Sequence, residues 1–277
     1  MRGLRRFLGR HLLTAFAILG FVYILLPIAV IALFSFNDPA GKYNYNWQGF
    51  TFQYWREVLA IPALRDAIIV SIEIALLVSV ISTILGTLIA LALVRHLFRG
   101  RSSTNLLIFL PMSTPEIVMG ASLLALFLNL GVSTGFVTIL LAHVTFCVSF
   151  VVVTVKARVT GFDRRLEEAA MDLGANVTRT FLRVTFPLIL PGIGAAALLS
   201  FALSLDDFVI TNFTKGTVIT FPVYIWGAAR IGVPVQVNVI GTMIFLIAVG
   251  IMAVGVLVSV VRARRDRAIA AQAVEAH

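Results

Sequence analysis

Long runs of apolar residues dominate this sequence and limit what the chain can fold into. Leu12–Phe34 contains 23 residues without a charged side chain, and similar runs recur along the 277 residues. A helix needs about 20 apolar residues to cross a bilayer. A chain that is 60% hydrophobic is too apolar for a soluble domain of this length. The sequence therefore predicts an all-α integral membrane protein, because lipid-spanning segments must satisfy their own backbone polar groups.

The apolar runs predict six transmembrane helices. The first is too long for the hydrophobic region of a signal peptide, and no small-residue cleavage site follows it. The third contains Pro111 and Pro115, which are expected to kink or break its helix. The six predicted spans are Leu12–Phe34, Ala67–Val94, Asn105–Leu130, Gly135–Val155, Leu188–Thr211 and Gln236–Val261.

The distribution of basic residues predicts how the chain is inserted. With the N-terminus in the cytoplasm, 17 of the 22 lysine and arginine residues fall in cytoplasmic segments and 5 in outer segments. This asymmetry follows the positive-inside rule. Both termini are therefore expected in the cytoplasm. The formal charge of +9 is explained by membrane topology, with lipid and no nucleic acid as partner.

The polar gap Glu167–Pro187 is expected to form two short helices outside the membrane. Gly174 is predicted to end the first helix and Asn176 to cap the second. Pro187 is expected to prevent the second helix from running straight on. Charged residues such as Arg164 and Glu167 are expected to form a polar rim around an apolar face. That face has helical spacing and consists of Leu166, Ala169, Ala170 and Leu173.

The same gap resembles the EAA loop of binding-protein-dependent ABC importer permeases of type I. The family pattern is E-A-A, three residues, G, nine residues and I-x-L-P. Here Val184 replaces isoleucine and Phe186 replaces leucine, and both keep apolar bulk. The resemblance extends over residues 67–261. The matching positions are Glu168, Ala169, Ala170, Gly174, Val184, Phe186 and Pro187.

The resemblance implies a permease fold in which the EAA loop is a cytoplasmic coupling helix docked on a separate ATP-binding subunit. It also implies a second permease subunit, in a homo- or heterodimer, two ATP-binding subunits and an extracytoplasmic substrate-binding protein, at a bacterial inner membrane. ATP and Mg²⁺ are expected in the ATPase subunit, because this sequence has no G-x-x-x-x-G-K-[ST] loop. No cofactor, catalytic residue or enzymatic activity is expected in this chain.

Three regions are predicted on this basis. Residues 1–66 form an N-terminal cytoplasmic tail, the first span and an outer loop. Residues 67–261 form the transmembrane domain, and residues 262–277 form a cytoplasmic tail. The single cysteine and the four scattered histidines make no metal-ligand spacing, and His143 is expected to be a hydrogen-bonded packing residue.

Acidic residues in the predicted spans indicate the substrate class. Charged groups in a membrane are costly and are functional candidates by default. Ser204–Phe213 also resembles the S-F-D-D-F-V-I segment of spermidine/putrescine permeases of the PotC type, with Leu205 for phenylalanine. An acidic pathway would attract the ammonium groups of a polyamine. The candidate pathway residues are Glu73 and Asp206 in the outer leaflet, Glu116 near the midplane, and Asp207.

Each acid also has a structural interpretation. Asp206 and Asp207 can mark the end of the fifth helix or bond to neighbouring polar residues. Glu73 can pair with a basic residue at the outer surface, and Glu116 can bond to backbone freed by the proline. Permeases for other small solutes, including phosphonates and ferric iron, share this layout. An ion-driven secondary transporter is a more distant alternative, and it would be expected to show inverted repeats.

Overall fold

A computed structural model describes residues 2–161 and 163–275, with side chains described for 12–161 and 163–261. Every regular element in these ranges is helical, and one isolated bridge joins Asn37 to Phe50. This confirms the predicted all-α class. The chain divides into two compact units, Pro62–Gly227 and a second unit of Met1–Ile61 with Ala228–His277. The region boundaries at 66 and 261 refer to membrane topology and stay predictions.

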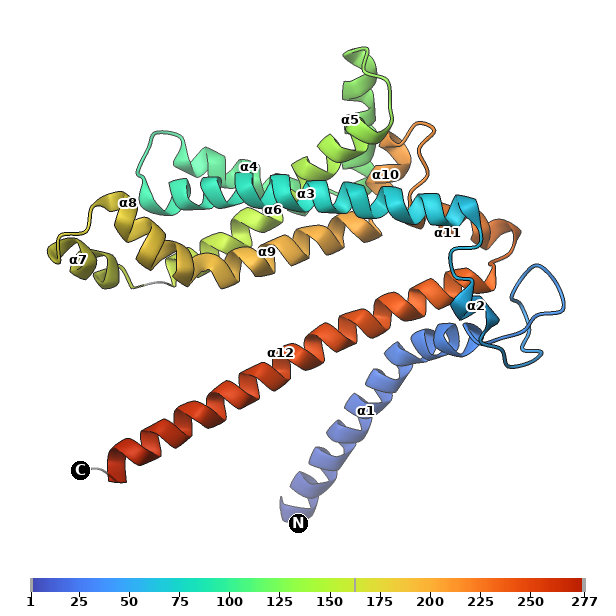
Figure 1. Cartoon of the computed structure of the whole chain (residues 1–277), viewed down its shortest axis with the longest axis horizontal. Coiled ribbons are helices and arrows are strands. Elements are labelled where there is room, and N and C mark those ends of the chain that lie inside the picture. Colours follow the sequence, from blue (N-terminus) through green and yellow to red (C-terminus); the bar gives the residue numbers. More distant parts are fainter. Residues whose placement is uncertain (1, 162, 276–277) are drawn as a thin grey trace. The chain divides into compact units, whose positions relative to one another are not determined.

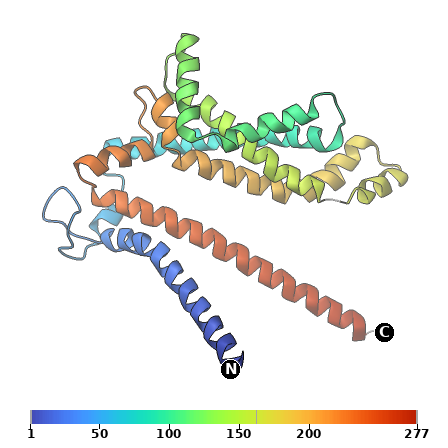
Figure 2. The same ribbon diagram turned by 180° about the vertical axis from the view of Figure 1, so that it is seen from behind.

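The unit Pro62–Gly227 is a bundle whose long helices run beside one another (Figures 1 and 2). Helices α3, α6 and α9 pack on each other along much of their length. Helix α11 (Phe221–Ile231) begins in this unit and ends in the other. The other elements of the unit are α3 (Pro62–Arg95), α4 (Arg101–Ser113), α5 (Glu116–Asn129), α6 (Phe136–Thr160), α7 (Arg165–Asp172), α8 (Val177–Thr180), the π-helical segment η1 (Phe181–Thr185), α9 (Phe186–Asp206) and α10 (Val209–Thr214).

Across the described part of the chain, six segments are long and apolar enough to cross a membrane if a bent pair counts as one. The pair is α4 and α5, which meet at an angle of 108°. This number agrees with the six predicted spans. The five unbroken segments are Leu12–Phe34, Pro62–Arg95, Phe136–Thr160, Val177–Asp206 and Val235–Val261.

Helix α3 packs through small residues. Its buried positions recur every three or four residues, and many of them are serine, alanine or glycine. A Cβ atom added to Gly86 would lie 2.5 Å from Cγ1 of Val151 on α6. Small residues let helix backbones approach closely in membranes, where van der Waals packing drives association. The small residues of α3 therefore allow α6 and α9 to pack closely on this span.

The predicted break in the third span lies at Pro115 and not at Pro111. Pro111 lies inside α4 without ending it. Thr114, the residue before Pro115, is extended, with φ −81° and ψ 132°. A proline disfavours helical geometry in the residue that precedes it. Pro115 therefore separates α4 from α5 and produces the bend.

Pro187 was expected to prevent the second short helix from running straight on, but it does not end that helix. Asn176 does cap α8, by accepting a hydrogen bond from the backbone N–H of Arg179 at 2.8 Å. From α8 the helix then continues through η1 into α9, and Pro187 lies in the first turn of α9. In η1 the backbone N–H of Phe186 reaches back five residues to the carbonyl of Phe181. A π-helical turn of this kind changes the hydrogen-bonding register, so the helix accommodates a residue without an N–H.

The fifth span also ends earlier than predicted. Leu188–Thr211 was expected as one helix, but α9 ends at Asp206 and α10 starts at Val209. Asp207 between them is extended, with φ −64° and ψ 119°. The acidic pair therefore lies at a helix break and not within a continuous helix.

The second unit contains α1 (Arg2–Phe34), α2 (Gln53–Arg56) and α12 (Val235–Glu275). Helices α1 and α12 are in contact, and a Cβ atom on Gly241 would lie 3.5 Å from Cγ2 of Ile31. The loop after α1 is tied to the segment before α12. The backbone N–H of Asn44 donates to the carbonyl of Val233 at 3.0 Å.

Candidate functional site

Helix α7 ends in the sharp turn that Gly174 predicts. Gly174 has a φ of +86°, and its N–H donates to the Met171 carbonyl at 2.9 Å. The N–H of Ala175 donates to the Ala170 carbonyl at 3.1 Å. These two bonds define a Schellman motif, which favours glycine at the left-handed position. The local sequence therefore fixes the direction in which the chain leaves α7.

The predicted apolar face of α7 is uncovered in this chain. No residue of α7 is buried, and the side chain of Leu173 is 91% exposed. Leu166 is exposed as well, by 50%. Exposed apolar patches in a folded protein often mark interaction sites. We use the name α7 stripe for Leu166, Ala169, Ala170 and Leu173.

A polar contact holds α7 against the end of α3. Nη2 of Arg95 and Oγ1 of Thr185 both donate to Oε1 of Glu167. Arg95 and Glu167 are largely buried, with 27% and 17% of their side chains exposed. Nη2 of Arg164 donates to the Val94 carbonyl at 3.2 Å. Because charge-assisted hydrogen bonds are the stronger kind, α7 is attached to the span and not only to its own loop.

Two residues of the predicted polar rim take part in these contacts. Arg164 and Glu167 were expected to surround the α7 stripe. Both instead bind residues at the end of α3. Figure 1 shows α7 and α8 at the end of the bundle that α3 reaches with its C-terminus. The other charged residues expected in the rim, Arg165, Glu168 and Asp172, are exposed, so the rim stays a prediction.

The second half of the EAA pattern lies in the π-helical turn. Val184 is in η1, and Phe186 and Pro187 begin α9. The segment η1 contacts α7, and Phe186 is 38% exposed. The rings of Phe181 and Phe186 lie 6.1 Å apart. The pattern therefore places its two halves beside each other at one end of the bundle.

Asp207 lies in a buried polar cluster with residues of three helices. Its Oδ2 accepts hydrogen bonds from the Thr211 backbone N–H at 2.8 Å and from the Thr211 hydroxyl at 3.0 Å. Nε2 of His143 lies 3.1 Å from the same oxygen. Nδ1 of His143 lies 2.8 Å from Oγ of Ser204. The cluster ties α6 to both sides of the break after α9, and it confirms His143 as a hydrogen-bonded packing residue.

The other three acids are exposed. Glu73, Glu116 and Asp206 make no hydrogen bond or ion pair with any residue whose side chain the structure describes. Glu116 is the first residue of α5, where a helix N-terminus favours negative charge. Asp206 is the last residue of α9, next to the buried Asp207. Three of the four candidate pathway residues are therefore available to a ligand or to another subunit.

Residues close to these acids in the sequence meet in one apolar core. Ile74 of α3, Met119 of α5 and Ile210 of α10 belong to the same cluster of buried residues. Ile74 is adjacent to Glu73, and the other two lie three or four residues from a candidate acid. A Cβ atom on Gly120 would lie 2.6 Å from the ring of Phe213, so α5 and α10 approach closely. Within the described residues, no three histidine, cysteine, aspartate or glutamate side chains form a group that could hold a metal.

Residues 82–270 match the family described as binding-protein-dependent transport system inner membrane component. The chain belongs to this family. The matched region runs from the middle of α3 into α12, and it includes α7, η1 and the acidic pair. Members of the family are membrane components of importers, so its description selects this class over an ion-driven transporter.

Curated permeases of this family align with the chain over nearly its whole length. It is 37% identical over 247 residues to the spermidine/putrescine transport system permease protein PotC of Haemophilus influenzae, covering 89% of this chain and 95% of the relative. It is also 37% identical over 258 residues to the putrescine transport system permease protein PotI of Escherichia coli strain K12, covering 90% and 91%.

Solved ABC transporters share the fold of this permease. A chain from a bacterial ABC transporter involved in the import of the acidic polysaccharide alginate has a TM-score of 0.62 at 19% identity, covering 92% of this chain and 96% of that one. A chain from an amino acid ABC transporter has a TM-score of 0.54 at 16% identity, covering 72% and 93%. These similarities confirm the predicted ABC importer permease fold.

Two features of the permease were not predicted from its sequence. The contact between Arg95 and Glu167 joins residues 72 positions apart. The contact between His143 and Asp207 spans 64 positions. Arg95 directly follows the predicted span Ala67–Val94, and His143 is a polar residue inside another predicted span. A charged or polar residue in or beside a span needs a hydrogen-bonding partner, but the sequence pattern does not identify that partner.

Proposed function

We propose that this permease translocates polyamines such as spermidine and putrescine. The observation that carries the proposal is the 37% identity, over about nine-tenths of the chain, to relatives named for these substrates. The exposed acids Glu73, Glu116 and Asp206 support a cationic substrate. Carboxylates in a pathway with low-dielectric walls attract ammonium groups over several ångströms. Asp207 would serve this pathway by fixing the helix break beside Asp206.

We infer that the α7 stripe docks on a separate ATP-binding subunit. The exposure of the stripe supports this role, because its two small alanine side chains permit close approach of another protein. The attachment of Glu167 to Arg95 gives a route for motion of α7 to reach α3. Closure of the ATPase subunits on ATP would then move the spans as rigid bodies, and ATP hydrolysis with Mg²⁺ in those subunits would reset them.

The proposed assembly contains two permease chains, two ATP-binding subunits and an extracytoplasmic substrate-binding protein in a bacterial inner membrane. Both termini of this chain and α7 lie in the cytoplasm, with residues 67–261 as the transmembrane domain. The excess of basic residues in those segments supports this orientation. A permease for another small solute, such as a phosphonate or ferric iron, is the alternative. The exposed carboxylates would repel an anionic phosphonate. Ferric iron would need a group of converging ligands, and no such group forms among the described residues.

The decisive experiment is uptake of labelled spermidine and putrescine into proteoliposomes. They would contain this chain with its partner permease and ATPase, with and without the substrate-binding protein. Uptake that requires both ATP and the binding protein supports the proposal. ATP hydrolysis that the binding protein stimulates without polyamine uptake would leave the importer class intact and reject the substrate.

A further inference from the structure

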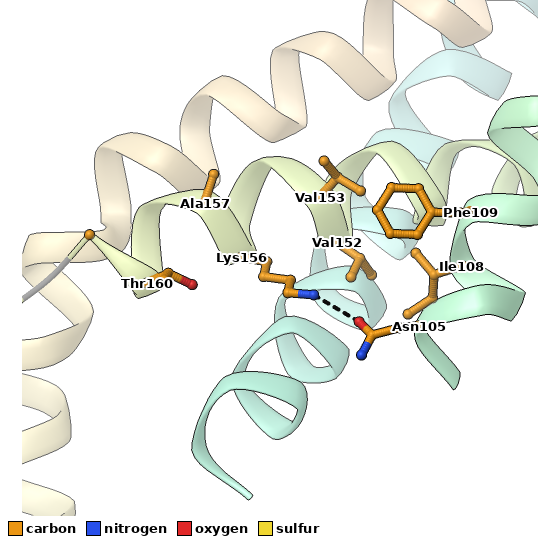
Figure 3. A pocket seen from close by; sticks show the side chains of 9 residues that line it. Asn105, Ile108, Phe109, Val152, Val153, Lys156, Ala157 and Thr160 are labelled. Atoms are coloured by element: carbon orange, nitrogen blue, oxygen red, sulfur yellow. Dashed lines mark hydrogen bonds between the residues drawn. The ribbon is translucent and has the colours of Figure 1, made fainter. Parts of the chain in front are cut away.

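A groove lies between α4 and α6, and none of the functions proposed above involves it. It has a volume of about 530 Å³ and opens to the outside of the bundle. Its inner walls are apolar, and its polar groups gather at one end (Figure 3). The lining residues are Asn105, Ile108 and Phe109 of α4, Val152, Val153, Lys156, Ala157 and Thr160 of α6, and Gly161.

Lys156 places a positive charge at the mouth of this groove. Its Nζ donates to Oδ1 of Asn105 at 2.7 Å, as Figure 3 shows. The amide of Asn105 is itself held by a bond from Nδ2 to the Arg101 carbonyl at 3.0 Å. An ammonium group has three donors, and Asn105 is the one partner of Lys156 among the described residues. The charge of Lys156 is therefore not balanced by any carboxylate of the described chain.

A second cation lies on the same side of α4. Arg101 precedes Asn105 by four residues, a spacing that puts both side chains on one helix face. Arg101 is half-buried, and its guanidinium forms no hydrogen bond or ion pair with a described residue. Arg101 does not line the groove, but it places a second unneutralised cation one turn of α4 before Asn105.

The depth of the groove matches the upper part of one membrane leaflet. Lys156 lies four residues before the end of α6, about 6 Å along its axis. From Thr160 to Val152 the wall extends roughly 12 Å towards the middle of the span. Phe109 and Val153 line its deeper part. A charged headgroup at the mouth would then have an acyl chain directly below it.

We propose that this groove binds one anionic phospholipid, with the phosphate on Lys156 and Arg101 and an acyl chain against Phe109 and Val153. The argument for this occupant is charge complementarity within a membrane-spanning segment. Basic pockets between transmembrane helices on the cytoplasmic side are suited to anionic headgroups. The site lies at the α7 end of α6, so a bound lipid would brace the spans next to the coupling element. This inference does not depend on the substrate.

Native mass spectrometry of the intact transporter tests the site by titration with dioleoylphosphatidylglycerol or dioleoylphosphatidylcholine. The wild type should bind one phosphatidylglycerol in preference to phosphatidylcholine. Lys156→Gln keeps a donor for Asn105 but removes the charge, so phosphatidylglycerol affinity should fall about fivefold, as expected for one basic residue near the membrane surface. Lys156→Arg keeps the charge and should bind phosphatidylglycerol as the wild type does.

Two further variants separate the groove from general surface charge. Ala157→Trp adds bulk at an exposed position of the groove without changing its charge, and it should also reduce phosphatidylglycerol binding. Lys215→Gln removes a half-buried lysine outside the groove and should leave binding unchanged. Equal binding by Lys156→Gln and wild type, or no preference between the two lipids, would overturn the proposal. So would crosslinking of Val153→Cys to the second permease, because the groove would then be a subunit interface.

Discussion

At the residue scale, Asp206 and Asp207 show how adjacent carboxylates take different roles. Asp207 is buried, and its Oδ2 already accepts two hydrogen bonds from Thr211 and contacts His143. Asp206 ends α9 and is exposed. A buried carboxylate that is fully bonded stabilises the fold, whereas an exposed one remains available to a cation. The two positions therefore separate stability from transport.

Asp207→Ala should destabilise the permease, and Asp206→Asn should not. The first change leaves the Thr211 N–H and His143 without their acceptor, which costs about 1–3 kcal/mol. The second changes an exposed side chain that makes no bond to the described residues. Thermal unfolding of the purified transporter should show a lower midpoint for Asp207→Ala only. Polyamine uptake should fall for Asp206→Asn at unchanged expression, and normal uptake would remove Asp206 from the pathway.

Arg95 and Glu167 should act as one unit. Each single change, Arg95→Gln or Glu167→Gln, leaves a largely buried charge without its partner and should weaken coupling of ATP hydrolysis to uptake. The double variant should be no worse than either single one. A double-mutant cycle on stability should give an interaction energy of roughly 0.5–3 kcal/mol. Additive losses would show that the contact does not join α7 to α3.

At the element scale, α7 and α9 show what local sequence can and cannot decide. The turn after α7 was predictable because Gly174 and Asn176 form hydrogen bonds only with residues close to them in the sequence. The continuation through Pro187 was not, since the π-helical turn before it changes the hydrogen-bonding register. The break after Asp206 was only one of the alternatives that the sequence left open, because the residues that stabilise it come partly from α6. Sequence patterns therefore predicted the spans and the α7 turn, but not the π-helical connection from α8 to α9.

Substitution of Gly174 should weaken docking without affecting insertion. A Cβ atom there would meet no neighbour within 4 Å, so the cost arises from the backbone. A non-glycine residue pays roughly 1–2 kcal/mol in the left-handed region. Gly174→Val should therefore reduce co-purification of the ATPase subunit and ATP-driven uptake. Gly174→Asn, which tolerates this conformation, is the matched control and should retain more of both.

At the scale of the whole molecule, the sequence predicted the class and the number of spans, and the structure confirms both. These depend on sums over many residues, so single errors do not matter. The side-chain clusters depend on a few contacts across long sequence separations. The Arg95–Glu167 and His143–Asp207 contacts each join distant helices. Periodicity reports which face of a helix is buried, but it does not identify the partner.

The orientation gives a further prediction that cysteine labelling can check. The native Cys147 is fully buried, so the wild type should not react with a membrane-impermeant maleimide and serves as the control. Gly41→Cys lies in the loop after the first span, where a Cβ atom has no neighbour within 4 Å, and it should react in intact spheroplasts. Leu173→Cys on the α7 stripe should react only after the membrane is opened. ATPase subunits bound to the stripe should then slow that reaction, whereas labelling of Leu173→Cys in intact spheroplasts would invert the proposed topology.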